Sequence, residues 1–261
     1  MSRLRPRQHA DLAVTAGALA ALLAWELAGL DLPLARLLGT AGGFPLRNHF
    51  LVSSVLHDGG RWLSGLLLAT LALDAWRPFV RGPGRRARIY WLAVVALGLV
   101  AVPLAKRFSA TSCPWDLTEF GGHAAYVPHW LPGLADGGPG HCFPSGHAVA
   151  AFAFFGTWFL WRDHRPRLAR AVLLGVLALG AAFAWAQMAR GAHFASHAMW
   201  SAWLCWTIAA AAQAAATRAQ PGASRGRDER ESPRAAEPGA LAPAPAFAAE
   251  FSAPAAPPSR S

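Results

Sequence analysis

Hydrophobic positions along this chain gather into long runs that are almost free of charge. Six runs stand out, at residues 12–30, 62–73, 89–105, 148–161, 171–186 and 198–216. Runs of this kind are typical of membrane spans, and two of them, at 62–73 and 148–161, fall well short of the ~20 residues that a helical span needs. We expect those two to extend into flanking residues. The pattern predicts an all-α membrane bundle with spans at about residues 12–30, 59–77, 89–105, 146–162, 168–186 and 197–216.

The composition agrees with a membrane chain. Of the 261 residues, 54% are hydrophobic and only 15% are charged. The first run follows Arg3, Arg5 and Arg7, as a signal peptide would, but it is longer than a typical signal h-region and further spans follow. We therefore predict an uncleaved first helix. Residues 217–261 are rich in Ala, Pro, Gly, Ser and Arg, which predicts a disordered tail after a single six-span domain at 1–216.

The distribution of arginine predicts an orientation. Two links between spans are rich in arginine. They carry Arg77, Arg81, Arg85, Arg86 and Arg88 after the second span and Arg162, Arg165, Arg167 and Arg170 after the fourth. The positive-inside rule places both links, and with them both termini, in the cytoplasm. The links at about 31–60, 106–147 and 187–197 then face outward, although Arg36 and Arg47 in the first of them oppose the rule.

The net charge of +10 is explained mostly by this topology. The arginines are spread over short loops beside spans, so we expect contact with membrane lipids and no nucleic-acid partner. Cys113 and Cys142 both fall in the second outward link, where a disulfide would survive, whereas Cys205 lies inside the last span as packing. A metal site from the first two cysteines and nearby histidines is an alternative. Because zinc-type spacing is missing, we expect no metal and no other cofactor.

The segment Cys142-Phe143-Pro144-Ser145-Gly146-His147 stands directly before the fourth run. Ser145 can cap the helix, and Gly146 lets a ligand approach the backbone. The free N–H groups of a helix start favour an anion, and histidine has an ordinary pKa close to neutrality. The segment predicts an anion site with a proton donor at His147, and a simple helix cap is the alternative.

Two further clusters fall on the same outward face. Lys106 and Arg107 end the third span, where they either complement the helix dipole and reach the headgroups or bind phosphate. Between the fifth and sixth spans, Arg190 precedes His193 and His197. A guanidinium suits phosphate oxygens, and histidines four residues apart share a helix face.

The predicted topology brings residues from three segments to one place. They are Lys106, Ser145, His147, Arg190 and His193. Two cations, a hydroxyl and helix N–H groups match the oxygens of a phosphoryl group, whose charge spreads in the transition state. One histidine can attack phosphorus while the other protonates the leaving oxygen. Since the sequence shows no cluster of carboxylates for Mg²⁺, these residues favour metal-free hydrolysis of a phosphate.

These motifs resemble those of the type 2 phosphatidic acid phosphatases, also called lipid phosphate phosphatases. The family pattern is Lys-x6-Arg-Pro, Pro-Ser-Gly-His and Ser-Arg-x5-His-x3-Asp, and residues 144–147 match the second motif outright. The resemblance covers about residues 50–210. It implies a six-helix bundle with a vanadium-haloperoxidase-like phosphatase core, in which His193 forms a phosphohistidine and His147 is the general acid. The residues that would bind phosphate are Lys106, Ser145, Gly146 and Arg190.

The chain departs from the family pattern at three positions. Cys113 stands at the arginine of the first motif, Gln187 at the arginine of the third, and His197 at the aspartate. Arg107 is a candidate to replace the first arginine. Arg190, about one helical turn after Gln187, is a candidate to replace the second.

The missing aspartate leaves His193 without the carboxylate that the family provides. Asp58 and Asp116, both in outward links, are candidates to take its place. A second register has His197 as the nucleophile and Ser201 at the aspartate position. The first register is preferred because the run His-Phe-Ala-Ser from His193 resembles the family's His-Tyr-Pro-Ser.

The resemblance implies a membrane phosphatase that hydrolyses a lipid phosphate or lipid diphosphate. It would lie in a bacterial-type inner membrane with its site facing the periplasm. Candidate substrates are phosphatidic acid, phosphatidylglycerol phosphate, undecaprenyl diphosphate and a lipid A phosphate. The outward link at 115–130, with Phe120, Tyr126 and Trp130, either helps to admit a lipid headgroup or only covers the outer surface.

Other functions stay open. A lipid-phosphate phosphotransferase would pass the phosphoryl group to another lipid instead of water. A non-catalytic lipid-phosphate binder or transporter is favoured by the changed motif positions. Vanadate haloperoxidases share the motifs, but their known members are soluble and six spans argue against them. The sequence leaves the oligomeric state open.

Overall fold

The structure is a computed structural model, and it describes residues 6–131 and 134–219. The chain divides into two units, residues 1–219 and 220–261, and the fold below is that of the first. Arg3 and Arg5 of the predicted basic start lie outside the described residues. So does the predicted tail from residue 220 onward.

Helices form almost all of the regular structure. The long ones are α1 (Pro6–Leu27), α3 (Gly59–Trp76), α4 (Arg85–Lys106), α7 (Pro166–Ala189) and α8 (Ala195–Arg218). The short ones are α2 (Asp31–Leu38), the π-helix η1 (Leu51–Asp58), the 3₁₀ turns η2 (Pro114–Asp116) and η3 (Thr118–Phe120), α5 (Val149–Phe152) and α6 (Phe155–Trp161). Strand-like pairing in the described part is limited to two isolated bridges. The all-α prediction is confirmed.

Each predicted span corresponds to helix in the structure. The fourth corresponds to α5 and α6 together, which are separated by a turn at residues 153–154. The last helix continues to Arg218, so the first two residues of the predicted tail are helical. Neither α2 nor η1 was predicted, because an element of eight residues is too short to show a clear helical period.

Helices α4 to α8 share one hydrophobic core. Trp91 of α4 stacks on Phe159 of α6 with ring centroids 5.4 Å apart, and Trp206 of α8 is buried in the same cluster. At Gly180 of α7, a Cβ atom would lie 2.1 Å from the ring of Phe152 in α5. Helix α7 therefore approaches α5 as closely as it does because residue 180 has no side chain.

Two buried ion pairs join helix ends in the links that were predicted to be cytoplasmic. Arg162 donates to both carboxylate oxygens of Asp11, at 2.7 and 2.8 Å. Arg88 pairs with Asp74 and also donates to backbone carbonyls. Burial of these charges is tolerated because each is paired and hydrogen-bonded.

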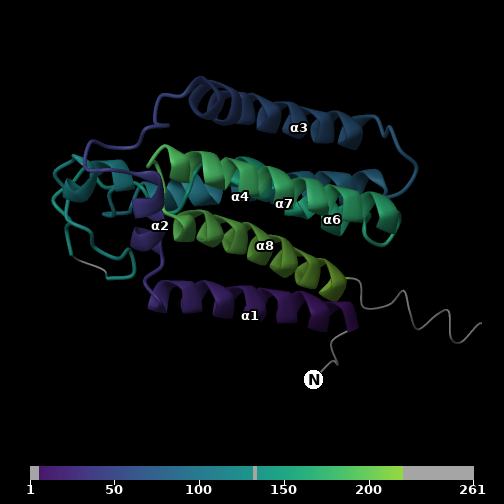
Figure 1. The fold of residues 1–261 in the computed structure, drawn as a ribbon. Coiled ribbons are helices and arrows are strands. Elements are labelled where there is room, and N and C mark those ends of the chain that lie inside the picture. The colour runs from purple at the N-terminus through teal and green to yellow at the C-terminus, as the bar shows by residue number, and fades with distance from the viewer. Residues whose placement is uncertain (1–5, 132–133, 220–261) are drawn as a thin grey trace, which may run out of the picture. The chain divides into compact units, whose positions relative to one another are not determined.

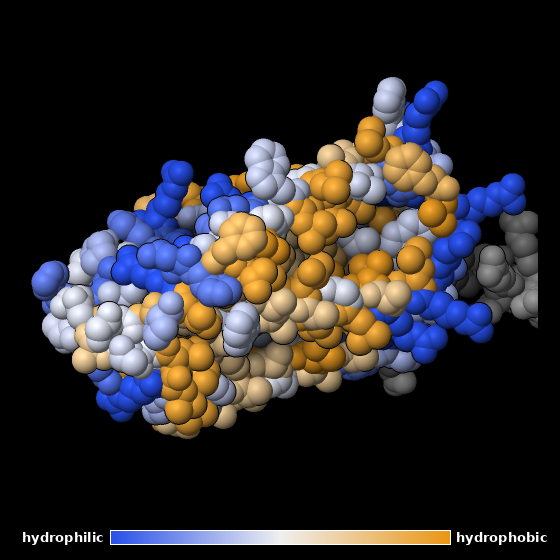
Figure 2. Space-filling view, turned by 45° about the horizontal axis from the view of Figure 1, so that its top comes forward, coloured by the Kyte–Doolittle hydropathy of each residue, from blue (hydrophilic) through white to orange (hydrophobic). Residues whose placement is uncertain are grey.

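Three helices among the described residues are long and apolar enough to cross a membrane, namely α1, α4 and α7, and the stretch Val149–Trp161 is a shorter apolar helix. The face in Figure 2 shows hydrophobic side chains in its middle part and blue, hydrophilic side chains toward both ends. A band of this kind matches the hydrocarbon layer of a bilayer. The chain is therefore a membrane protein by length and composition of its helices, while the count of six spans stays a prediction.

Figure 1 shows the long helices running alongside one another, with α2 and the link 107–148 gathered at one end. The end of α4, the segment before α5 and the link between α7 and α8 all reach that end. The three clusters singled out from the sequence are carried by these three segments. The topology thus places them at the same end of the bundle.

Candidate active site

The Pro-Ser-Gly-His segment is held against the start of α8. The N–H of Ser145 donates to the carbonyl of His197 at 3.0 Å, and the hydroxyl of Ser201 donates to the carbonyl of Ser145 at 2.9 Å. The Ser145 hydroxyl accepts a hydrogen bond from the N–H of Ala148 at 3.4 Å, as a helix cap does. Ser145 is fully buried, so these bonds fix the segment relative to α8.

Cys113 and Cys142 form a disulfide, the pairing that the sequence left open. The bond joins the beginning of the link 107–148 to its end, where Cys142 lies two residues before Pro144. Both cysteines are buried. The position of the first motif's arginine therefore carries a structural cross-link and no charge.

His147 is buried and oriented by the backbone. Its Nε2 lies 3.1 Å from the carbonyl oxygen of Leu56 in η1. A carbonyl only accepts, so Nε2 carries the hydrogen and Nδ1 is left for a ligand. The ring stacks on His57 with centroids 4.6 Å apart. Burial, and after it the nearby His57, lowers the pKa of His147 to about 4, so the ring is neutral at pH 7 until an anion binds beside it.

His193 lies in the link between α7 and α8 and is buried. Its Nδ1 faces the Nδ1 of His197 at 3.4 Å and the Sγ of Cys142 at 3.6 Å. The second ring nitrogen, Nε2, points away from both atoms. Burial, followed by the charges of His197 and Lys106, holds the pKa of His193 well below its usual range. The imidazole is therefore neutral, and a lone pair is available for attack on phosphorus.

Two cations flank the histidines. Lys106 ends α4 beside Gly146, where a Cβ atom would lie 3.7 Å from the lysine Cδ, and its charge acts on the pKa of His193. Arg190 follows the last residue of α7, and its charge acts on the pKa of His147. The Nε of Arg190 donates to a backbone carbonyl of the first outward link at 3.1 Å. This hydrogen bond engages only Nε. The two terminal nitrogens of the guanidinium are the ones that suit an anion.

The other candidate residues have different neighbours. Asp116 accepts a hydrogen bond from the backbone of its own turn at 3.2 Å, and Asp58 lies 3.0 Å from the ring of the adjacent histidine. Arg107 is exposed just after α4. The side chain that the structure places beside the Nδ1 of His193, where the family has a carboxylate, is His197.

Gln187 occupies the position of the third motif's arginine and is only 2% exposed. Its backbone carbonyl accepts hydrogen bonds from the N–H groups of Ala192 and His193 at 2.8 and 3.3 Å. Its side-chain Nε2 is buried without a hydrogen-bond partner among the described residues. Such a group costs about 1–3 kcal/mol.

Asp31 of α2 is a buried residue of this region that the sequence did not reveal. Its carboxylate accepts hydrogen bonds from the N–H of Ser196 at 3.0 Å and from the indole of Trp25 at 2.9 Å, and the Ser196 hydroxyl bonds to it as well. It thereby caps the first turn of α8 from another element, three residues after His193. No local motif signals this contact, because the partners are 165 residues apart.

Another histidine, His129, lies next to His197 on the side of Phe143 and α1. His129 stacks on Phe143 with centroids 3.8 Å apart and meets His197 edge-on at 5.8 Å. The Nε2 of His129 lies 3.3 Å from the carboxylate of Glu26 in α1, which also accepts the indole N–H of Trp200. Burial lowers the pKa of His129 to about 4.

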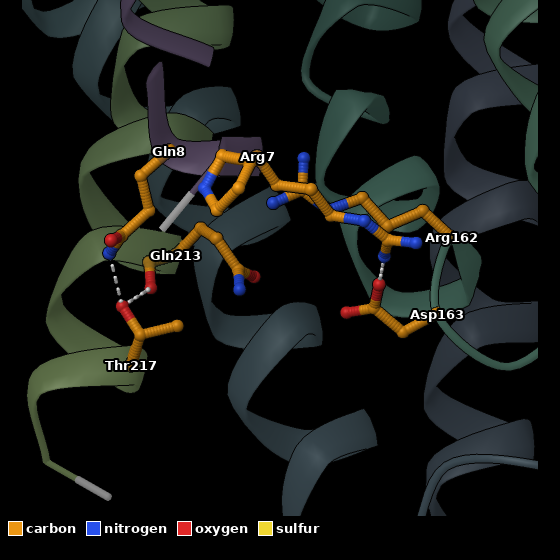
Figure 3. A pocket seen from close by; sticks show the side chains of 7 residues that line it. Arg7, Gln8, Arg162, Asp163, Gln213 and Thr217 are labelled. Atoms are coloured by element: carbon orange, nitrogen blue, oxygen red, sulfur yellow. Dashed lines mark hydrogen bonds and ion pairs between the residues drawn. The ribbon is translucent and has the colours of Figure 1, made fainter. Parts of the chain in front are cut away.

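Figure 3 shows a pocket at the opposite end of the bundle, between the start of α1, the end of α6 and the end of α8. Its lining includes two arginines, and both are already paired. Arg7 pairs with Asp163, and Arg162 pairs with Asp11. A phosphate would have to break one of these ion pairs to bind there. The histidine cluster at the other end of the bundle is therefore the better candidate site.

Comparison with known proteins agrees with this choice. A family model described as the PAP2 superfamily matches residues 87–220, just over half of the chain. The matched region contains Lys106, the Pro-Ser-Gly-His segment and His193, and it begins after α3. Neither the comparison with curated proteins nor that with solved structures found a match. The chain belongs to the PAP2 superfamily, whose members are phosphatases and related phosphoesterases.

Proposed function

We propose that this membrane phosphatase hydrolyses a lipid phosphate or lipid diphosphate through a phosphohistidine on His193. One observation carries the proposal. A neutral His193 has its Nδ1 beside the Nδ1 of His197, which leaves Nε2 for attack. Lys106 and His147, from two other segments, act on His193, and Arg190 of its own link acts on His147. This arrangement supplies a nucleophile, an acid and cations for the phosphoryl oxygens.

In the first step, the Nε2 lone pair of His193 forms a bond to phosphorus, and the bond from phosphorus to the leaving oxygen breaks. His147 takes up a proton from solvent on Nδ1 when the anionic substrate binds, and it delivers this proton to the leaving oxygen. Its Nε2–H is committed to the carbonyl of Leu56, so the proton leaves from Nδ1. Lys106, Arg190 and the N–H groups before α5 stabilise the charge on the equatorial oxygens.

In the second step, water attacks the phosphohistidine. The Nδ1 of His147, now neutral, accepts the proton of that water as the bond between phosphorus and nitrogen breaks. Phosphate is released, and both histidines return to the protonation states that they have in the substrate complex. The same residue thus acts first as acid and then as base.

A lipid substrate is favoured by an apolar groove beside the Pro-Ser-Gly-His segment. The groove has a volume of about 570 Å³, and its lining includes Phe108, Trp130, Phe143, Pro144, Trp200 and Leu204. Trp130 is half exposed, whereas Phe120 is buried against Phe44. Part of the link at 115–130 thus lines the groove and part of it packs. We expect acyl or prenyl chains to lie along the groove with the phosphate at His193.

Orientation supports the same substrate class. The arginine-rich links lie at the end of the bundle opposite to the histidines. The positive-inside rule then places the histidines at the outer face of the inner membrane, where they would meet outer-leaflet phosphates.

The test is phosphate release by the full chain in detergent micelles, measured over a panel of lipid phosphates and lipid diphosphates. His193→Ala is expected to abolish release and the acid-labile phosphoprotein seen with labelled substrate. His147→Ala is expected to lose ~10²–10⁴-fold in kcat on lipid phosphates and much less on p-nitrophenyl phosphate, whose leaving group needs no proton. His123→Ala, an exposed histidine in the link 107–148, is the matched control.

Full activity in His193→Ala would overturn the assignment of the nucleophile. Tight binding of a lipid phosphate without release would identify a binder instead. Appearance of labelled phosphate on an added lipid acceptor, in place of free phosphate, would identify a phosphotransferase.

A further inference from the structure

Three potential metal ligands meet in the buried region behind the nucleophile. The Sγ of Cys142 and ring nitrogens of His193 and His197 all lie within 4.8 Å of one another. The three side chains are at most 5% exposed. They come from two segments 50 residues apart, which is why the spacing along the sequence gave no sign of a zinc site.

Two of the three separations between these atoms are those expected around a tetrahedral ion, and the third pair lies within 4.8 Å. The Nδ1 atoms of the two histidines are 3.4 Å apart, and the sulfur is 3.6 Å from the Nδ1 of His193. Zinc binds sulfur at about 2.3 Å and imidazole nitrogen at about 2.0–2.1 Å. The edges of a tetrahedron with these bonds are ~3.4 Å between two nitrogens and ~3.6 Å between nitrogen and sulfur.

The sulfur is at present part of the disulfide with Cys113. A disulfide sulfur is a poor ligand, because metal ions bind the thiolate. Two histidines alone make a weak site here, since the ammonium group of Lys106 acts on His193 and disfavours a cation. A thiolate would offset that charge. The chemical state of Cys142 therefore decides whether the cluster can hold an ion.

We propose that reduction of the Cys113–Cys142 disulfide by a dithiol opens a buried site in which the Cys142 thiolate, His193 and His197 bind Zn²⁺ or a similar thiophilic ion. In the exchange, the dithiol is oxidised to its own disulfide and two cysteine thiols form. Ion binding then displaces the proton of the Cys142 thiol. Water or the Cys113 thiolate completes the coordination, since the Cα atoms of the two cysteines are only 5.2 Å apart.

The ion would switch off the chemistry proposed above, and this consequence alone rests on the proposed function. A neutral imidazole that gives its Nδ1 lone pair to a metal carries its hydrogen on Nε2. That nitrogen is then no longer a nucleophile. The disulfide would keep His193 free for attack, and loss of the disulfide in the presence of Zn²⁺ would stop turnover.

The test uses Co²⁺ as the probe ion and the full chain in detergent micelles. Binding is followed by the visible bands of tetrahedral Co²⁺ and by the thiolate-to-cobalt charge-transfer band in the near ultraviolet. We expect one equivalent to bind after reduction with a phosphine and none to the oxidised protein, and Zn²⁺ to displace the cobalt. Equal binding by the oxidised and reduced forms would overturn the proposal.

A matched pair of variants identifies the sulfur. Cys113→Ser and Cys142→Ser both remove the disulfide and each leaves one thiol of the pair, so they differ only in which thiol of the pair remains. In a Cys205→Ala background, which removes the remaining buried thiol of α8, Cys113→Ser should bind Co²⁺ without any reductant and Cys142→Ser should not. Equal spectra from the two variants would overturn the role of Cys142.

Two further measurements separate folding from metal binding. Circular dichroism measures the helical content and shows whether each variant is folded. The variant His197→Ala, studied in its reduced form, removes one proposed ligand and keeps both cysteines. It is expected to weaken Co²⁺ binding at least tenfold; unchanged binding would contradict the site. Phosphate release by the oxidised, metal-free protein tests the phosphatase alone, so either proposal can fail without the other.

Discussion

The Nδ1 of His197 lies 3.4 Å from the Nδ1 of His193, at the position where the family has an aspartate. Attack by Nε2 gives the His193 ring a positive charge, and a carboxylate would stabilise that charge while a neutral imidazole would not. The backbone carbonyl of His197 holds Ser145 in place. Because this contact belongs to the main chain, the side chain at 197 can be changed without removing it.

His197→Asp is expected to raise kcat for a lipid phosphate by about tenfold at pH 7, which corresponds to ~1.4 kcal/mol of transition-state stabilisation. The new carboxylate would accept the Nδ1 hydrogen of His193 and offset the charge of the phosphohistidine. His197→Asn, which has the same shape without the charge, serves as the control. A kcat for the aspartate variant no higher than that of the asparagine variant would argue against the charge effect.

Gln187→Arg restores the family's arginine at a buried position whose amide nitrogen has no partner among the described residues. A guanidinium there would pair with the bound phosphate, so the Kd for orthovanadate, a phosphate analogue, should fall by about tenfold or ~1.4 kcal/mol. Gln187→Leu removes the donor and should weaken vanadate binding. Calorimetry on the detergent-solubilised protein measures both, and equal affinities in the two variants would show that residue 187 does not face the phosphate.

Stability should depend on pH through the buried histidines. In the folded chain the pKa of His129 and that of His147 are lowered to about 4 from an ordinary value of 6.5. Between these pH values the unfolded chain binds more protons, so the free energy of unfolding decreases as pH falls from 6.5 toward 4. The thermal midpoint is expected to drop by several degrees from pH 7 to pH 5. A double variant, His129→Gln with His147→Gln, should show a shallower drop, and an unchanged slope would exclude these two residues as its source.

Asp31 is expected to act as a positioning residue for the nucleophile. Asp31→Ala removes the oxygens that accept hydrogen bonds from the Ser196 N–H and hydroxyl, so the first turn of α8 loses a cap that is typically worth ~1 kcal/mol. We expect a lower kcat with a nearly unchanged KM, because His193 is displaced while the phosphate-binding cations stay in place. Asp31→Glu, which retains the charge, should recover part of kcat. A purely structural role would instead lower the thermal midpoint and leave kcat per folded molecule unchanged.

Sequence periodicity predicted the helical architecture well and the detailed site only in part. Long apolar runs revealed every long helix, and the Pro-Ser-Gly-His motif revealed His147. The neighbours of that motif were harder to predict. The carbonyl of Leu56 and the carboxylate of Asp31 reach the site from elements that precede the motif by many residues. Contacts of this kind depend on tertiary packing and leave no local pattern.

The substitutions at the motif positions illustrate the same limit. From the sequence, Asp58 and Asp116 were equal candidates to replace the missing aspartate. The structure gives each of them another neighbour and places His197 beside His193 instead. The tertiary structure determines which side chain lies where the family has its aspartate, and the spacing of residues along the sequence does not determine this.

The contacts of Leu56 and Asp31 also bear on how such proteins can be cut and recombined. The family match begins at residue 87, yet the acceptor that sets the tautomer of His147 and the cap of α8 both come before it. A chimaera that transplants only the matched segment would carry every recognisable motif and still lack two of their supports. The matched segment is therefore shorter than the part of the chain that contributes contacts to the candidate site.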